Sequence, residues 1–153
     1  DMDKDFTMLR ATCALPMFFP AIELDGQKYY DGGIADPIPA KKALEDGCDK
    51  LIIVLTQPRG FVKHFGKYDK IGARMLGHRY PEMKRQIFSR PERYNETVKY
   101  CEQLETEGKA MIIRPNHLLN SFESNVSRLE MAYWHGYRMT KEKMKKIKRQ
   151  WFG

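Results

Sequence analysis

A continuous apolar run, Leu51–Leu55, constrains the fold of this chain more than any other feature of its sequence. The run is rich in β-branched residues, which is typical of a strand covered on both faces in an α/β sheet. We therefore expect a buried strand over residues 50–56. The same run is far shorter than the roughly 20 apolar residues that cross a bilayer.

Turn signals predict two more strands near this one. An Asp-Gly pair marks a tight turn in the middle of residues 22–31, which are expected to form a hairpin. A strand, a helix and a second apolar strand then follow within about 30 residues, as in a βαβ unit. We therefore expect the strands over 28–31, 50–56 and 110–114 to share one sheet.

Capping residues and glycines set the expected helix ends. Asp36 followed by Pro37 predicts a helix over 37–46, with the aspartate as N-cap and Gly47 just past the end. The remaining helices are expected over part of 69–89, from Tyr94 up to Gly108, over 126–135 (stopped by Gly136) and over 139–151.

The net charge of +7 is concentrated in two segments. Residues 59–93 carry ten Lys or Arg against three Asp or Glu, and residues 138–149 carry seven against one. Such segments attract phosphates or anionic lipid head groups, whereas a solvated helix face is the structural alternative. Because no nucleic-acid motif and no stacking pattern of aromatic residues accompanies them, we expect no nucleic-acid partner.

The sequence lacks the common motifs for a nucleophile or a metal. None of its four serines has a glycine two places before or after it, so the Gly-x-Ser-x-Gly elbow of serine hydrolases is missing. The four histidines form no pair at ligand spacing, and we expect neither a metal nor a cofactor. Cys13, Cys48 and Cys101 fit buried thiols in a reducing compartment, so a cytoplasmic protein is expected.

Asp31-Gly32-Gly33 is the segment in which chemistry is expected. Its carboxylate follows a predicted strand, and open α/β sheets bind ligands at the carboxyl ends of their strands. The two glycines remove side-chain bulk, so that a substrate or another backbone can approach closely. A simple Asp-Gly turn would explain the same residues without any chemistry.

These three residues belong to a longer ordered pattern. Its elements are Ala14-Leu15-Pro16, Phe18-Phe19-Pro20, Tyr30-Asp31-Gly32-Gly33 and Pro37-Ile38-Pro39, followed by the apolar strand. In this order they resemble the patatin-like phospholipases, and more narrowly the bacterial members with an extra C-terminal segment. The resemblance is strong over 1–58, moderate over 94–137 and nearly absent over 59–93.

The resemblance implies a fold and a domain organisation. We expect an α/β fold, namely part of a three-layer α/β/α patatin-like domain followed by a mostly helical C-terminal extension. Residues 1–58 would be the C-terminal part of the catalytic domain, and residues 59–93 a basic insertion. Residues 94–153 would form an α/β extension that ends in a basic amphipathic helix.

The resemblance also implies an activity. Patatin-like enzymes hydrolyse acyl esters with a Ser–Asp dyad and no histidine, and Asp31 matches the dyad aspartate, with Gly32 and Gly33 as support. The nucleophilic serine and the oxyanion loop belong to the N-terminal half of that family. The chain is therefore expected to be the C-terminal part of a lipid acyl hydrolase, inactive by itself and prone to self-association through an uncovered apolar face.

A non-catalytic role is the alternative. Met144, Ile147 and Trp151 share one face of the predicted C-terminal helix, and lysines crowd the remainder. Packing of that face against the domain is the structural explanation. A basic amphipathic helix would also serve as a lipid-surface or protein-interaction module, in peripheral contact with a membrane.

Overall fold

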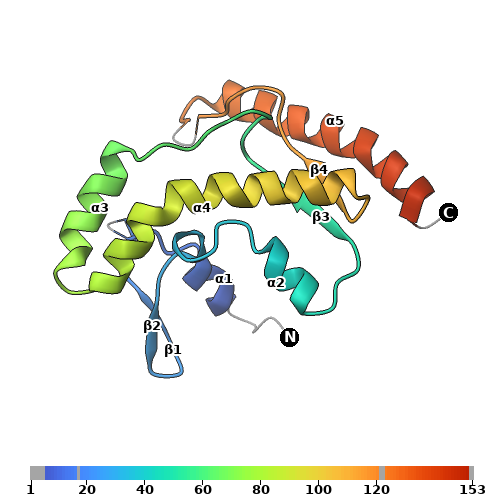
Figure 1. Cartoon of the computed structure of the whole chain (residues 1–153). Helices are drawn as coiled ribbons and strands as arrows, with labels where there is room; N and C mark the ends of the chain where they lie inside the picture. Colours follow the sequence, from blue (N-terminus) through green and yellow to red (C-terminus); the bar gives the residue numbers. More distant parts are fainter. Residues whose placement is uncertain (1–5, 17, 121–122, 152–153) are drawn as a thin grey trace. The chain divides into compact units, whose positions relative to one another are not determined.

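The computed structural model describes residues 6–16, 18–120 and 123–151 (Figure 1). The chain divides into two compact units, and each takes two separate stretches of sequence. The first unit comprises Asp1–Pro39 and Lys63–Val98, and the second comprises Ala40–Val62 and Lys99–Gly153. Helices dominate both units, and small sheets accompany them, which is compatible with the expected α/β class.

The first unit contains the predicted hairpin. Its elements are α1 (Thr7–Thr12), β1 (Ile22–Leu24), β2 (Gln27–Tyr29), the 3-10 helix η1 (Gly32–Ile34), α3 (Lys67–Gly77) and the first part of α4 (Pro81–Thr106). β1 and β2 pair antiparallel. Asp25 and Gly26 connect them with φ angles of 50° and 73°. Positive φ at both residues is what a two-residue hairpin turn requires, because it matches the twist of the strands.

The core of the first unit joins η1, α3 and α4. Ile34, Ala73 and Ile87 are buried, and three partly buried side chains pack against them: Phe65, Leu76 and Met83. Because Ile34 is the last residue of η1, this small core also anchors the segment that follows Asp31. Pro91 lies inside α4 and removes one backbone donor, and the helix bends in its first half (Figure 1).

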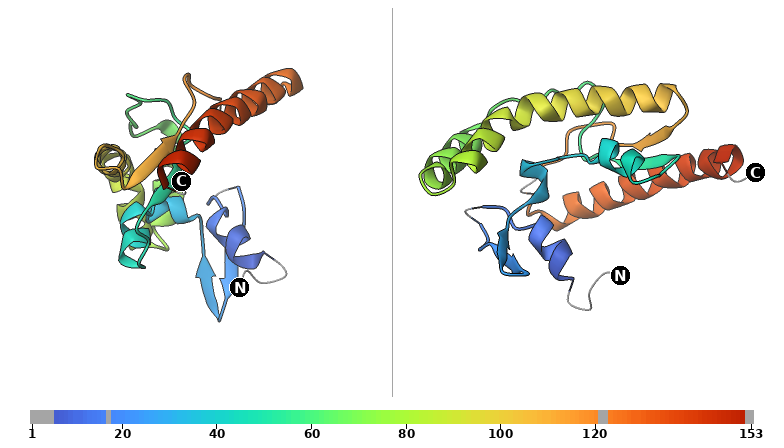
Figure 2. Two further views of the ribbon diagram at one scale, coloured as in Figure 1. Left: turned by 90° about the vertical axis from the view of Figure 1, so that its right-hand side faces the viewer. Right: turned by 60° about the horizontal axis from the view of Figure 1, so that its bottom comes forward.

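The second unit is built around a parallel pair of strands. Its elements are α2 (Ala40–Glu45), β3 (Leu51–Val54), the end of α4, β4 (Ala110–Ile113) and α5 (Val126–Trp151). Leu51 lies opposite Ala110, and Val54 lies opposite Ile113. α5 contacts β4, and α2 contacts β3 (Figure 2). All four residues of β4 are buried, so this strand forms the centre of the unit.

The prediction of one sheet for residues 28–31, 50–56 and 110–114 is wrong. Within the described part of the chain, β2 pairs with β1 alone and β3 pairs with β4 alone. The residues of β2 are all exposed, so this strand has no apolar face to bury in a central sheet. A short antiparallel hairpin satisfies its backbone instead.

The apolar run at 50–56 forms a strand, β3, that is covered on one face only, in agreement with the uncovered apolar face expected for this chain. Leu51 and Ile53 are buried, whereas Ile52 is 47% exposed and Val54 is 70% exposed. One face of β3 is therefore open, although its residues are as apolar as those of the covered face. Self-association through this face stays a prediction.

The helix after Asp36 begins later than predicted. α2 starts at Ala40, and Asp36 Oδ1 accepts a hydrogen bond from the backbone N–H of Ile38 (3.3 Å) in a local turn. Ile38 precedes Pro39, and the ring of a proline disfavours helical geometry in the residue before it. The predicted end is confirmed, because Gly47 follows α2 with a φ of 95°.

The two predicted C-terminal helices are one continuous helix, α5, and Gly136 lies inside it. A glycine in a helix interior costs about 1 kcal/mol relative to alanine, which is too little to end a helix that is stabilised elsewhere. Asn125 Oδ1 caps the start by accepting from the backbone N–H of Arg128 (3.1 Å). Ile147 is fully buried near the other end.

The cysteine prediction is correct for one residue of three. Cys101 is fully buried on α4, whereas Cys13 and Cys48 are exposed. Cys13 directly follows α1, and Cys48 follows the glycine that ends α2. Connecting segments that follow a helix usually lie on the surface, even where the neighbouring residues in the sequence are apolar.

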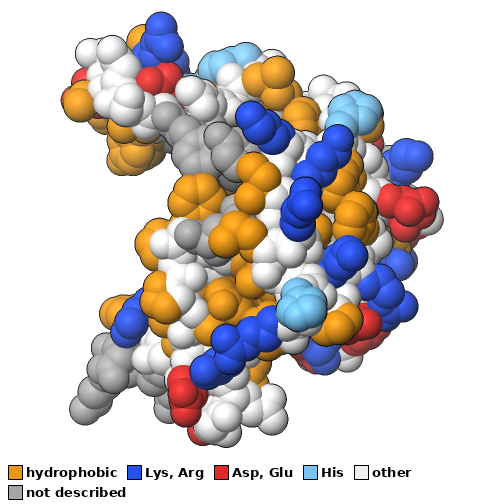
Figure 3. Space-filling view, turned by 90° about the vertical axis from the view of Figure 1, so that its left-hand side faces the viewer, with side chains coloured by type: hydrophobic (Ala, Val, Ile, Leu, Met, Phe, Trp, Pro, Cys, Tyr) orange, Lys and Arg blue, Asp and Glu red, His pale blue; other side chains and the backbone are white. Residues whose placement is uncertain are grey.

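Basic side chains are prominent on the surface (Figure 3), as expected from the net charge of +7. On the face that Figure 3 shows, Lys and Arg side chains are more prominent than Asp and Glu, and hydrophobic side chains are exposed among them. Among the helices that the structure describes, none has the length and apolar character needed to cross a membrane.

Replacing Gly136 by alanine should stabilise the protein by about 1 kcal/mol, because a Cβ there meets no atom within 4 Å and the helix gains backbone rigidity. Gly108→Ala is the matched control. Gly108 has a φ of 74°, so a side chain strains the backbone and should destabilise the fold. Urea denaturation followed by circular dichroism measures both changes. Destabilisation by Gly136→Ala would show that α5 is not continuous at this position.

Candidate functional site

Asp31 lies at the N-cap of η1, two residues after β2. Its Oδ1 accepts a hydrogen bond from the backbone N–H of Gly33 (2.8 Å), and its own N–H donates to the carbonyl oxygen of Ala14 (3.0 Å). Aspartate suits this position because its short side chain satisfies a backbone donor at the start of a helical turn. As expected, Asp31 lies just past the carboxyl end of a strand and is partly accessible. That strand is β2 of the hairpin, so the expected membership in the sheet of residues 50–56 is wrong.

The Asp31 carboxylate is half-buried and held on one side. Oδ1 has the Gly33 donor, whereas Oδ2 accepts no hydrogen bond from any residue that the structure describes. A carboxylate oriented through one oxygen presents the other in a defined direction. This geometry can accept a proton or a hydrogen bond from a further group.

Gly32 and Gly33 are required by close packing around this carboxylate. A Cβ on Gly32 would lie 2.5 Å from Thr12 Oγ1, and a Cβ on Gly33 would lie 2.9 Å from Asp31 Oδ1. Both distances are shorter than van der Waals contact. The groups that approach these glycines are side chains of the fold, and close approach by a substrate or another backbone stays a prediction.

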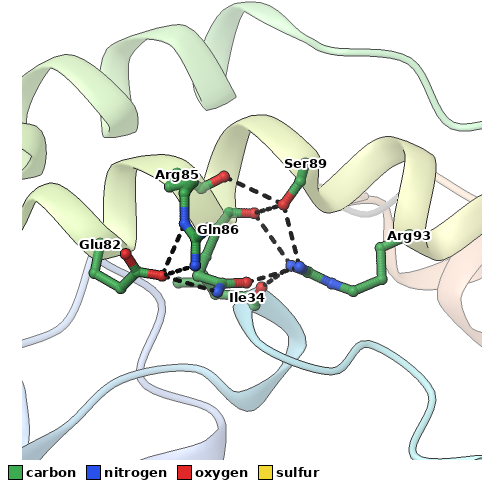
Figure 4. A network of polar contacts seen from close by, with 6 residues as sticks. All are labelled: Ile34, Glu82, Arg85, Gln86, Ser89 and Arg93. Carbon is green, nitrogen blue, oxygen red and sulfur yellow. Dashed lines mark hydrogen bonds and ion pairs between the residues drawn. The ribbon is translucent and has the colours of Figure 1, made fainter.

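Two arginines of α4 hold the Asp31-Gly32-Gly33 segment in place. Arg90 Nε donates to the carbonyl oxygen of Gly33 (3.0 Å), and Arg93 Nη2 donates to that of Ile34 (2.5 Å). Figure 4 shows Arg93 reaching Ile34 while it also binds Gln86 and Ser89 on its own helix. Hydrogen bonds from a charged donor are about twice as strong as those between neutral groups.

Sequence analysis missed these two arginines as part of the site. They belong to the basic segment 59–93, which carries ten Lys or Arg in total, and the composition of the segment does not distinguish these two from the other eight. Their spacing of three on a helix puts them on one face and was the available signal. Nothing in the sequence tells which helix face meets the Asp31 segment.

Two more charged groups of the first unit, Asp69 and Lys63, interact with Arg90. Arg90 also approaches Asp69, with 3.8 Å between Nη1 and Oδ1. Burial, and then the charge of Arg90, lower the pKa of Lys63 below its usual value.

A second feature is a groove of about 940 Å³ in the other unit. Its lining is mostly apolar and includes Leu118, Met131 and Trp134. His117 and His135 meet there, with their ring centroids 4.8 Å apart. In the described ranges, no group of three or more His, Cys, Asp or Glu side chains is placed to hold a metal ion.

Comparison with known proteins supports the sequence resemblance in the first unit. Residues 6–44 match the family model of the patatin-like phospholipases, and the match includes Asp31, Gly32 and Gly33. The resemblance inferred from the sequence is thereby confirmed for this stretch. At the coarse level it indicates a hydrolase-type family that acts on lipids.

Two further similarities extend the comparison. Residues 80–152 match a domain of unknown function, DUF6363. A stretch of 52 residues is 40% identical to YjjU, an uncharacterized protein of Escherichia coli strain K12. That alignment covers 33% of this chain but 15% of the relative, so the chain spans a small part of the curated protein that it matches.

Replacing Arg93 by alanine should destabilise the protein by about 2–4 kcal/mol, because the buried carbonyl oxygen of Ile34 and the Gln86 side chain lose a charged donor. Arg93→Lys should restore less than half of the loss, since an ammonium cannot reproduce the guanidinium fork. The matched control is Arg85→Ala on the same helix. Arg85 binds exposed Glu82, and its loss should cost less than about 1 kcal/mol in thermal or urea unfolding. Equal effects at the two positions would contradict a special role for Arg93.

Proposed function

We propose that this chain is the C-terminal part of a serine acyl hydrolase that cleaves lipid acyl esters through a Ser–Asp dyad, with Asp31 as the dyad aspartate. The patatin-like match over residues 6–44 supports the family. The observation that carries the assignment of Asp31 is its geometry: Oδ1 is held by the Gly33 N–H, and Oδ2 is left open among the described residues.

Such a carboxylate can perform the proton transfers of acyl transfer. Oδ2 would accept the hydrogen bond of a serine hydroxyl and take its proton as the serine oxygen attacks the ester carbonyl. The same proton would then pass to the departing alkoxide, and an acyl-serine would remain. In the second half of the reaction, Asp31 would take a proton from water as the water oxygen attacks the acyl carbonyl. It would then return that proton to the serine oxygen as the bond between acyl carbon and serine oxygen breaks and the fatty acid leaves. General base catalysis of this kind contributes about 10²–10⁴-fold.

The serine and the oxyanion donors are proposed to lie outside this chain, in a part that precedes residue 1. The open face of β3 supports a larger assembly, because Ile52 and Val54 are apolar and exposed. A covering layer on that face would complete the three-layer α/β/α arrangement. In this proposal, residues 1–58 end the catalytic domain, 59–93 are an insertion and 94–153 are an extension.

The proposed substrate is a lipid or another acyl ester, and the proposed location is the cytoplasm, in peripheral contact with membranes. No cofactor or metal takes part in this chemistry, because the carboxylate and the hydroxyl carry all of the proton transfers. A non-catalytic lipid-surface or interaction module is the second candidate. The exposed aromatic and basic face of α5, described below, favours it as an additional role.

Asp31→Asn should lower turnover of a short acyl ester by about 10²–10⁴-fold in the intact protein that carries the serine. The amide keeps the size of the side chain and the acceptor for Gly33, but it cannot take a proton. Asp36→Asn is the matched control, since it lies five residues away and caps a turn. It should leave turnover unchanged. Ester hydrolysis and circular dichroism of both variants provide the measurement.

Two results would refute the assignment. One is full activity of Asp31→Asn with its fold preserved, which would place the base elsewhere. The other is clear ester turnover by the present chain alone, since a carboxylate without the serine and its oxyanion donors lacks most of the rate enhancement.

A further inference from the structure

Three aromatic side chains form an exposed cluster on the first half of α5. Tyr133, Trp134 and Tyr137 are 64%, 54% and 49% exposed. Their ring centroids lie 5.3 Å apart for Tyr133 and Trp134 and 5.6 Å apart for Trp134 and Tyr137, both in edge-to-face geometry. The rings therefore pack on one another and leave a large apolar area open to solvent. Contiguous exposed apolar area of this kind marks an interaction site.

Lysines continue the same face of the helix. Trp134, Tyr137, Lys141, Lys145 and Lys148 are spaced by three or four residues, which places them along one side of α5. Lys141 Nζ lies 5.9 Å from the centroid of the Tyr137 ring. Lys145 and Lys148 are exposed and have no ion-pair partner among the residues that the structure describes.

The other side of α5 is used by the fold of the second unit. Ile147 is fully buried there, α5 contacts β4, and Lys143 Nζ lies 3.7 Å from Glu105. The aromatic and basic face is thus distinct from the packing face. Figure 1 shows α5 as one unbroken helix, so both halves of the exposed face belong to one rigid element.

We propose that this face of α5 binds the surface of an anionic lipid bilayer. Tyr and Trp prefer the head-group region, because each has an apolar ring and a polar tip. The lysines complement negative head groups, and residues 138–149 carry seven Lys or Arg against one Glu. An amphipathic helix with aromatic and basic residues side by side lies in the plane of such a surface.

This inference deepens the second candidate function, the lipid-surface module, and it uses none of the Asp31 site, so it does not depend on the proposed hydrolase chemistry. It assigns a role to part of the stretch that matches the domain of unknown function, residues 80–152. In a lipid hydrolase, this stretch would hold the protein at the membrane surface that contains its substrate.

Vesicle binding by the full chain tests the proposal, with vesicles of about 3:1 phosphatidylcholine to phosphatidylserine compared with phosphatidylcholine alone. The double change Lys145→Gln and Lys148→Gln should weaken binding to the anionic vesicles by about 30-fold, from the usual contribution of each lysine near such a surface. Trp134→Ala with Tyr137→Ala should weaken it by about tenfold or more. Circular dichroism should be unchanged in both, since all four side chains are exposed.

Matched controls separate this face from general attraction to a basic protein. Lys70→Gln with Arg74→Gln removes two exposed charges from another helix, α3, and Tyr29→Ala removes a ring that is 45% exposed on the hairpin. Both should bind nearly as well as the parent chain. Asp31→Asn should also bind normally, so failure of the hydrolase proposal would leave this result untouched.

A spectroscopic readout reports insertion directly. The chain has two tryptophans, so Trp151→Phe leaves Trp134 as the reporter. Its emission should shift to the blue with anionic vesicles and stay unchanged with phosphatidylcholine alone. Equal binding to both kinds of vesicle, equal losses in the control variants, or binding without an emission shift would each overturn the proposal.

Discussion

The hydrogen bonds from Arg90 and Arg93 to the carbonyl oxygens of Gly33 and Ile34 are the interactions on which the first unit depends. They satisfy acceptors that the short helix η1 leaves open, and they fix the segment that carries Asp31. They also connect two regions of the chain that match two different family models. The arginines belong to the stretch that matches DUF6363, and the carbonyls belong to the patatin-like stretch. The C-terminal region therefore supports the candidate site physically.

Features that depend on local chemistry could be predicted from the sequence. The hairpin turn needs positive φ at two residues, and an Asp-Gly pair supplies it at low cost. Gly47 and Gly108 end their helices for the same reason, and the apolar residues of β4 are buried as a strand. Two adjacent glycines after Asp31 also indicate a place of close approach, and side chains of the fold lie close to both.

Features that depend on distant contacts could not be predicted. The sequence does not tell which strands share a sheet, because β2 and β3 each satisfy the local rules for a strand. Gly136 looked like a helix end, but capping by Asn125 and burial of Ile147 outweigh its small cost. Arg90 and Arg93 could not be separated from eight other cations in their segment without knowledge of the helix face that meets η1.

Two exposed faces of the second unit, on β3 and on α5, have different physical characters. β3 presents Ile52 and Val54 without any charge pattern, which suits a covering layer of protein. α5 presents aromatic rings beside exposed lysines, which suits an interface with anionic lipid. In the proposed hydrolase, the first surface would be covered by the rest of the catalytic domain and the second would hold the protein near its substrate.

The most direct measurement of the central claim is a crystal structure of the intact protein with a phosphonate ester bound covalently to its nucleophile. The account predicts that Asp31 Oδ2 lies about 2.6–3.2 Å from the serine oxygen, with Oδ1 still bonded to the Gly33 N–H. A histidine or a different carboxylate at that position, with Asp31 out of hydrogen-bond reach of the serine, would contradict it.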